Sequence, residues 1–406
     1  MKVTLQCFLN QSQTMRNTLI SGSRITALLL IAACSTTRDA PVSPAMQTAA
    51  ANSVAAVTQA RDAGQVTGRV SVYARGLQNP RGLKFSPDGI LYVAEGGTGG
   101  TNSTVGSCEQ VPIPVGPYLG SRTGGRISRI SSSGVRSTVT DQLPSSSANE
   151  IIGGDVEGVA DIAFIDDAMY ALVAGGGCSH GVAQAPGPRP NGVVRVRDDG
   201  SWSYVANLSA WSLNHPVANP ELDDFEPDGT PYSMVAVRGA LYAVEPNHGE
   251  LLRITTAGDV SRVLDISASQ GHAVPTALAY RGNFFVGNLH PFPNPGGASS
   301  IWKITPSGQI TLKATGLNMV LGLVVADDAR MYVLEMTAGA PFPTPGLGRV
   351  LRIDPSGAKT VIASGLTFPT GMTLGPDGNL YVSNVGFSPA STAGGGQVLR
   401  IQIADH

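Results

Sequence analysis

A five-residue phrase recurs along the chain, with an apolar residue first, an aromatic residue second and, in most copies, an acid or amide last. Clear copies are Leu91–Glu95, Leu241–Glu245, Phe284–Asn288, Met331–Glu335 and Leu380–Asn384, and Met169–Val173 is a degenerate copy. From aromatic to aromatic, the last three steps are 43, 47 and 49 residues, and the first two are 78 and 72. A short strand phrase with this period is typical of propeller blades. The sequence therefore predicts an all-β fold, a six-bladed β-propeller.

The segments around each phrase complete a four-stranded blade. An alternating strand such as Arg349–Ile353 follows the phrase, and a short strand precedes it. The preceding strands carry a small residue where six strands would crowd around an axis, at Gly82, Gly158, Ser233, Ala277, Gly322 and Gly371. The last blade lacks an outer strand, whereas an unassigned strand over residues 68–73 precedes the first. We expect this N-terminal strand to close the ring, and we assign residues 66–406 to the propeller.

Composition agrees with short strands and tight turns. The chain has 50 glycines, 28 prolines and only 14% charged residues. Its net charge is −2, and the Lys and Arg residues are scattered singly. These features disfavour a nucleic-acid partner.

The N-terminus predicts export. Arg16 and Arg24 precede a short apolar run over residues 25–33, which is too short to span a bilayer. We interpret residues 1–33 as a signal peptide, with Met15 as an alternative start, and residues 34–65 as a flexible tether. The segment ending at Cys34 resembles a bacterial lipobox, so Cys34 is a candidate lipidation site; the alternative is a cysteine beside an ordinary cleavage site. The expected location is periplasmic, membrane-anchored or extracellular, with the membrane contacted only through the lipid.

Two cysteines belong to the predicted body, Cys108 and Cys178. Each follows the second strand of its blade, and the two blades are neighbours. Export places them in an oxidising compartment, where a pair is usually bridged. We expect a Cys108–Cys178 disulfide; the alternative is two isolated thiols.

Loop length differs between the two ends of the blades. Nearly all inserted sequence follows the second strand or joins two blades, at 96–124, 174–191, 206–230, 289–299, 336–347 and 385–395. These connections should share one face, here called the long-loop face, and binding surfaces of repeat proteins commonly lie where insertions collect. Two Pro-rich segments with a central aromatic, 290–295 and 340–345, offer rigid apolar side chains there; the alternative is that they pack over the channel mouth.

Candidate binding residues fall into two sets. Glu95, Glu245, Asn288, Glu335 and Asn384 end the repeated phrases at equivalent heights. Their oxygen atoms suit Ca²⁺, with Glu95, Glu245 and Glu335 as the carboxylate ligands; the alternative is that each caps a strand end. The second set lies at the starts of the innermost strands and comprises Arg81, Glu157, Tyr232, His272 and Thr276. Glu157 forms an acidic cluster with Asp155 and Asp161, in the blade whose phrase ends in Val173.

Catalytic motifs are not evident. The sequence has no Gly-x-Ser-x-Gly elbow, no Cys beside a matched base and no phosphate-binding glycine loop. The histidines at 180, 215, 248, 272 and 290 show no metal-ligand spacing, and we interpret each as a surface or loop-packing residue.

Several phrases in this order resemble the ScyD/ScyE family of exported bacterial proteins. They are residues 79–89 (NPRGLKFSPDG), 92–97 (YVAEGG), 231–233 (PYS), 274–276 (VPT), the Pro-rich segment around Phe292 and the GRVLRI segment ending at Ile353. The resemblance covers about residues 70–403 and implies an exported propeller of the NHL and SGL type. It implies little about mechanism. Asn288 stands where the family phrase usually ends in Glu, which weakens a shared metal site.

Two functions remain from the sequence. The favoured one, in the absence of a catalytic motif, is a binding or scaffold module rather than an enzyme. It would use the long-loop face for a small molecule, glycan or protein and act as a monomer. The alternative is a metal-dependent hydrolase similar to the lactonase propellers, with a cation in the central channel acting as Lewis acid. That alternative requires ligands on the innermost strands, where only Glu157 is placed.

Overall fold

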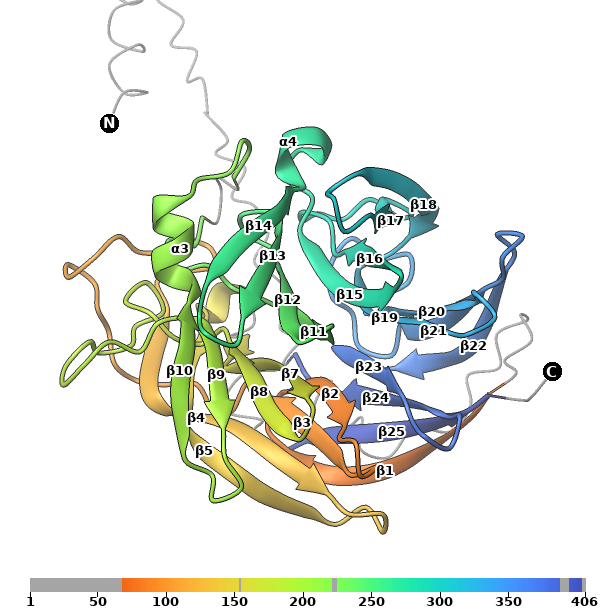
Figure 1. Cartoon of the computed structure of the whole chain (residues 1–406), viewed down its shortest axis with the longest axis horizontal. Helices are drawn as coiled ribbons and strands as arrows, with labels where there is room; N and C mark the ends of the chain where they lie inside the picture. The colour runs from red at the N-terminus through yellow and green to blue at the C-terminus, as the bar shows by residue number, and fades with distance from the viewer. Residues whose placement is uncertain (1–67, 153–154, 221–224, 388–393, 404–406) are drawn as a thin grey trace, which may run out of the picture. The chain divides into compact units, whose positions relative to one another are not determined.

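The structure, a computed structural model, describes residues 68–152, 155–220, 225–387 and 394–403. The predicted signal peptide, Cys34 and the predicted tether lie outside the described residues. Strands make up six antiparallel sheets arranged as a ring, with one innermost strand of each sheet toward the centre (Figure 1). The described part of the chain therefore confirms the six-bladed β-propeller.

The first three blades contain the largest connections. The first sheet comprises β2 (Pro80–Phe85), β3 (Leu91–Glu95), β4 (Leu119–Ile130), β5 (Arg136–Ser147) and the short β6 (Val156–Glu157). The second comprises β7 (Val159–Ile165), β8 (Ala168–Val173), β9 (Gly192–Val196) and β10 (Trp202–Asn207). The third comprises β11 (Ser233–Val237), β12 (Ala240–Glu245), β13 (Glu250–Thr255) and β14 (Val260–Asp265). Short helices η2 (Glu150–Ile152), α3 (Leu208–Asn214) and α4 (Ser267–Gln270) occur between blades.

The other three blades follow the repeat closely. The fourth comprises β15 (Pro275–Arg281), β16 (Asn283–Asn288), β17 (Ser299–Ile304) and β18 (Ile310–Leu317). The fifth comprises β19 (Val320–Val325), β20 (Met331–Glu335), β21 (Gly348–Ile353) and β22 (Lys359–Leu366). The sixth comprises β23 (Gly371–Leu374), β24 (Leu380–Asn384), β25 (Gly396–Gln402) and β1 (Arg69–Leu77). In that sheet β1 pairs antiparallel with β25, from Arg69 opposite Gln402 to Leu77 opposite Gly396, so the N-terminal strand covers the edge of β25.

The hydrophobic core lies between blades rather than inside one of them. Six clusters of buried side chains each join two neighbouring blades, for example Leu172 with Met234 and Leu334 with Val382. The cluster of Leu83 and Tyr381 joins the first blade to the sixth. Each blade is therefore apolar on both faces, which explains why central strands such as β8 and β20 are almost continuously apolar.

Crowding at the axis accounts for the small residues of the innermost strands. A Cβ atom on Gly82 would lie 2.1 Å from Oδ1 of Asp161 in the next blade. A Cβ atom on Gly371 would lie 2.4 Å from the carbonyl oxygen of Arg81. Only glycine permits this approach of neighbouring innermost strands.

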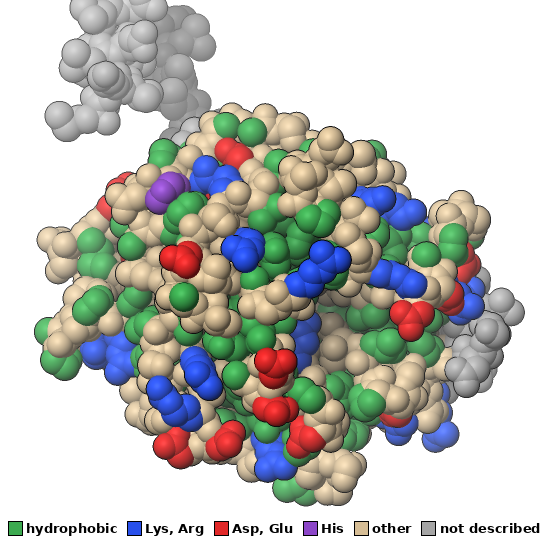
Figure 2. All heavy atoms as spheres, viewed as in Figure 1, with side chains coloured by type: hydrophobic (Ala, Val, Ile, Leu, Met, Phe, Trp, Pro, Cys, Tyr) green, Lys and Arg blue, Asp and Glu red, His purple; other side chains and the backbone are tan. Residues whose placement is uncertain are grey.

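The two ends of the ring differ as the loop lengths predict. In an antiparallel blade, the connection after the second strand and the link to the next blade leave from the same edge. The opposite edge carries only the tight turns. Figure 2 shows one face of the molecule, on which Lys, Arg, Asp and Glu side chains are interspersed. No helix among the described residues is long and apolar enough to cross a membrane.

Candidate functional site

The residues that end the repeated phrases hold the chain segment that enters each innermost strand. Glu95 accepts a hydrogen bond from the backbone N–H of Gln78 at 2.5 Å, and Glu335 accepts one from Asn318 at 2.8 Å. Glu245 accepts one from Thr230 at 2.7 Å. These side chains are almost completely buried, so they stabilise blade architecture.

The two amide copies also bind backbone groups of these segments. The side chain of Asn384 accepts a hydrogen bond from the backbone N–H of Thr367 at 2.9 Å. The Nδ2 atom of Asn288 donates to the carbonyl of Ala273 at 2.7 Å. All five side chains therefore bind backbone groups at a strand end, which is the alternative to Ca²⁺ binding that the sequence left open.

The structure does not bring the predicted Ca²⁺ ligands together. Glu95 binds Arg126, with Nε at 2.9 Å from Oε1, and Glu335 binds Arg349. Glu245 binds Nδ1 of His248 at 2.9 Å. Within the described ranges, the single group of three side chains placed to hold a metal ion contains none of these glutamates.

A second polar group lies at the innermost strands. Arg81 donates to Oδ1 of Asp155 and to the carbonyl of Val156, both at 2.7 Å. Burial raises the pKa of Asp155 to about 6, although Arg81 acts in the opposite direction. Tyr232 donates to the carbonyl of Thr370 at 2.8 Å, and burial raises its pKa as well. Arg81 and Tyr232 are thus held in place by neighbouring segments of the ring.

The remaining candidates at the innermost strands do not converge. Thr276 donates to the carbonyl of Val320 in the next blade. His272 is half-buried just before β15. The carboxylate of Asp161 accepts backbone N–H groups of Ile162 and Met234, both at 2.8 Å. A cavity of about 20 Å³ at the centre of the ring is lined by Asp161, Tyr232 and mostly apolar or small residues.

Glu157, His180 and Glu226 form the cluster that most resembles a functional site. Nε2 of His180 lies 3.3 Å from Oε2 of Glu157 and 3.2 Å from Oε2 of Glu226. His180 is completely buried, and the side chains of Glu157 and Glu226 are 15% and 6% exposed. Burial lowers the pKa of His180, but the two neighbouring carboxylates outweigh it and raise the pKa to about 10.

Three separate connections supply this cluster. Glu157 ends β6, His180 lies in the loop from β8 to β9, and Glu226 lies in the connection that leads to β11. His180 is not a surface residue, because both carboxylates and an aromatic ring enclose it; of the two expected positions, packing among the loops is the one that fits. Of the three, the sequence pointed only to Glu157. A signal for His180 was available, since it lies two residues after a cysteine predicted to bridge two loops.

Neighbouring side chains hold the cluster in position. Tyr118 donates to Oε1 of Glu226 at 3.3 Å, and its ring lies 4.6 Å from the ring of His180. Thr230 donates to the carboxylate of Glu157 at 3.1 Å. The backbone N–H of Glu226 donates to the side chain of Asn247 at 2.9 Å. Both carboxylates therefore have defined orientations.

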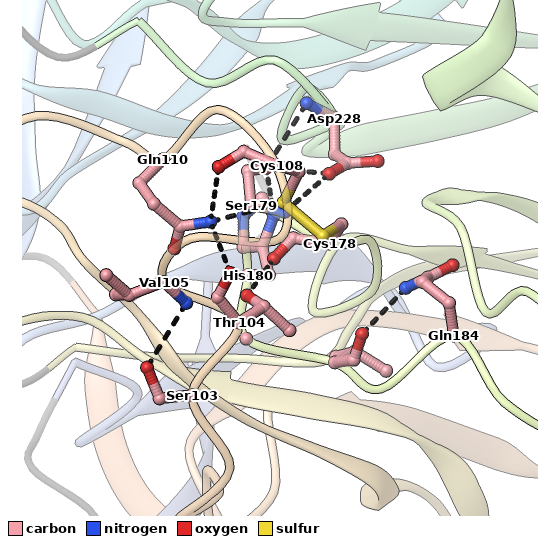
Figure 3. Close-up of a disulfide and its surroundings, with 12 residues drawn as sticks. Ser103, Thr104, Val105, Cys108, Gln110, Cys178, Ser179, His180, Gln184 and Asp228 are labelled. Atoms are coloured by element: carbon pink, nitrogen blue, oxygen red, sulfur yellow. Dashed lines mark hydrogen bonds between the residues drawn. A yellow bond between two sulfur atoms is a disulfide. The ribbon is translucent and has the colours of Figure 1, made fainter.

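The predicted disulfide is present beside the cluster. Cys108 and Cys178 are bonded, and they join the loop after β3 to the loop after β8 (Figure 3). Next to it, Ser179 donates through its backbone N–H and its hydroxyl to Oδ2 of Asp228, at 2.8 and 2.7 Å. The loop that carries His180 is thus tied to the first blade and to the connection before the third.

Comparison with known proteins bears on the fold alone. No family model and no curated protein matches the chain. A protein of unknown function from Bacteroides thetaiotaomicron has a TM-score of 0.50 at 12% identity, covering 82% of this chain and 76% of that one. A gluconolactonase from Xanthomonas campestris has a TM-score of 0.49 at 11% identity, covering 85% and 94%. A protein from Thermus thermophilus, described as an oxidoreductase (glucose dehydrogenase), has a TM-score of 0.48 at 18% identity, covering 82% and 100%.

The sheets described above define the class of protein as a six-bladed β-propeller, and the likeness to the Bacteroides protein agrees with that fold. The resemblance to the ScyD/ScyE family rests only on the sequence phrases quoted above. The activities named for the compared proteins belong to those proteins.

Proposed function

We propose that this protein is an exported binding module that recognises its partner through apolar side chains on the long-loop face. The observation that carries the proposal is where large apolar side chains are exposed. Among the described residues, seven of the eleven exposed large hydrophobic residues lie in the long connections: Val105, Ile113, Leu119, Leu213, Phe292, Phe342 and Leu347. Exposed apolar groups gathered on one face are a common mark of an interaction surface.

Phe292 and Phe342 form the most defined part of this surface. They are 47% and 48% exposed, and their rings stack with centroids 5.9 Å apart. The two loops belong to neighbouring blades and are joined by a hydrogen bond from the N–H of Asn294 to the carbonyl of Pro341, at 2.9 Å. A half-exposed aromatic pair on rigid loops is a suitable anchor for an apolar group of a protein or small molecule.

The loops of the first two blades are also held rigid. Nδ2 of Asn102 donates to the carbonyl of Gly181 at 2.6 Å, and Arg122 donates to the carbonyl of Gly187 at 2.8 Å. With the Cys108–Cys178 disulfide, these contacts order the surface before a partner arrives. Pre-ordering reduces the entropy lost on binding.

Export and membrane attachment belong to the same proposal. The predicted signal peptide and Cys34 would place the propeller outside the cytoplasm, and we propose that it acts there as a monomer. The disulfide is compatible with that location, as is the lack of a membrane-spanning helix in the described ranges. Labelling cells with a radioactive fatty acid and comparing the natural chain with Cys34→Ser tests the anchor.

A matched pair of double variants tests the binding face. Phe292→Ala with Phe342→Ala removes the aromatic pair, whereas Val135→Ala with Leu312→Ala removes exposed apolar groups outside the long-loop face. Both proteins would be cross-linked in extracts of the producing cell's envelope, and the captured molecules compared by mass spectrometry. The proposal expects a partner that the natural chain and the Val135/Leu312 variant capture equally and the Phe292/Phe342 variant loses. Equal capture by all three proteins would refute it.

The lactonase-like enzyme stays a prediction with less support. Its cation was expected in the central channel, but Asp161 is the one carboxylate that lines the described channel cavity, and it already accepts two backbone N–H groups. A lactone-hydrolysis screen with Ca²⁺ and Zn²⁺ added tests this alternative directly.

A further inference from the structure

The cluster of Glu157, His180 and Glu226 has distances that suit a metal ion better than direct hydrogen bonds. Charge-assisted N–H···O bonds are usually about 2.7–2.9 Å long. The Nε2 to Oε2 distances are 3.3 and 3.2 Å, and Nε2 forms no hydrogen bond of acceptable geometry with any described residue. Ligand atoms at about 2.0–2.1 Å from a tetrahedral ion are about 3.3–3.4 Å apart, which matches these separations.

The charge of the cluster points the same way. Two carboxylates face the single imidazole of His180, which is completely buried. Burying carboxylates is costly unless their charge is paired. A divalent cation bound by two carboxylates and a neutral imidazole would leave no net charge.

The surroundings have the form of an outer ligand shell. Tyr118 donates to Oε1 of Glu226, which leaves Oε2 directed at His180. Thr230 binds the carboxylate of Glu157 from the other side. Outer partners of this kind orient metal ligands and tune their affinity.

We propose that Glu157, His180 and Glu226 bind one divalent transition-metal ion of the Zn²⁺ class. An imidazole nitrogen with two carboxylate oxygens suits Zn²⁺ and similar ions, whereas Ca²⁺ prefers six to eight oxygen ligands. The ion joins the connection before β7, the loop after β8 and the connection before β11, so it stabilises the loops of the first three blades. This site is separate from the apolar aromatic pair, and the binding role above does not depend on it.

Zinc binding to the full-length chain tests the proposal. Protein dialysed against a chelator would be titrated with Zn²⁺ alone by calorimetry, and its metal content measured after removal of free ion. We expect one Zn²⁺ per chain and a higher melting temperature on Zn²⁺ addition than on addition of equal Ca²⁺. Replacement by Co²⁺ should give the visible absorption of a low-coordinate site with nitrogen and oxygen ligands.

Variants locate the site. His180→Gln and Glu226→Gln should each weaken Zn²⁺ binding about 100-fold or more, while His290→Gln, a control on the same face, should bind as the natural chain does. Tyr118→Phe should weaken binding about 10-fold and keep the Co²⁺ spectrum, because Tyr118 positions Glu226 without contacting the ion. If His180→Gln does not fold, Glu157→Gln at the partly exposed member gives the same test.

Two results would overturn the proposal. One is a chelated natural chain that takes up no stoichiometric Zn²⁺ and shows no change in melting temperature. The other is stoichiometric Zn²⁺ that His180→Gln and Glu157→Gln bind as tightly as His290→Gln, since the ion would then lie elsewhere.

Discussion

In three blades, the residue that ends the repeated phrase matches the residue opposite it on the next strand. Glu95 lies opposite Arg126 and Glu335 opposite Arg349, whereas Asn384 lies opposite Gln397. In the first and fifth blades the glutamate thus faces a cation, and in the sixth an amide faces an amide. The third blade departs from this pattern, because Glu245 lies opposite Glu250 and pairs with His248 instead. Converting the fifth blade to the chemistry of the sixth, with Glu335→Asn and Arg349→Gln, tests whether the two positions act as a unit.

The magnitudes follow from burial. Glu335 is completely buried and accepts from Arg349 and from the N–H of Asn318. Glu335→Asn removes the partner of the Arg349 guanidinium; because that side chain is 28% exposed and can be hydrated, we expect a loss of about 2 kcal/mol in the free energy of unfolding. Arg349→Gln leaves a completely buried carboxylate with one backbone donor, and we expect a larger loss of about 3 kcal/mol.

The double variant decides between a coupled pair and two independent residues. It places an amide opposite an amide, as Asn384 and Gln397 are in the sixth blade, so we expect a loss of about 3 kcal/mol rather than the sum of about 5. The measurement is the urea midpoint followed by tryptophan fluorescence, with the slope compared among the four proteins. Losses that add to within about 0.5 kcal/mol would refute the coupling and the explanation of the Glu and Asn pattern.

Three further predictions concern other parts of the ring. The pKa of Glu245 is lowered, since His248 outweighs the effect of burial, and that of His248 is raised because Glu245 outweighs burial. The lowered pKa of Glu245 contributes stability above its unfolded pKa of 4.5, and the raised pKa of His248 contributes stability below its unfolded pKa of 6.5. His248→Gln should therefore lower the free energy of unfolding by about 3 kcal/mol at pH 5.5 and by less at pH 9. Urea midpoints measured at the two pH values test this. Replacing Cys108 and Cys178 by Ser opens a link across a sequence separation of 70 and should cost about 4 kcal/mol, with a matching drop when the natural chain is reduced; unchanged stability would contradict a structural disulfide. Deleting residues 1–77 removes β1 and exposes the edge of β25, so light scattering should show association that deletion of residues 1–65 does not cause.

Much of the fold could be predicted because the repeated residues meet structural requirements that all blades share. The aromatic phrases marked the second strands, and the small residues of the first strands marked the crowded axis at Gly82 and Gly371. The disulfide followed from the expectation that equivalent loops of neighbouring blades leave the same edge. These inferences needed only strand period and blade order.

The candidate site could not be predicted in the same way, because its geometry depends on connections whose conformation the repeat does not determine. His180 and Glu226 lie in long connections whose sequences do not repeat from blade to blade, and they are 46 positions apart in the chain. Their approach depends on local contacts such as Ser179 with Asp228 and Tyr118 with Glu226. Sequence spacing carries no information about such contacts.

The repeated residues of this propeller therefore serve its architecture, and the cluster that resembles a functional site is made of residues that do not repeat. The acid or amide that ends five of the six phrases serves a structural need that these blades share, because Glu95, Glu335 and Asn384 each bind the segment that enters an innermost strand. Glu157 and His180 have no equivalents in the other blades as described, yet they are buried together with oriented partners. Burying carboxylates is costly unless they are paired, and a cation bound at this cluster would stabilise both of them directly.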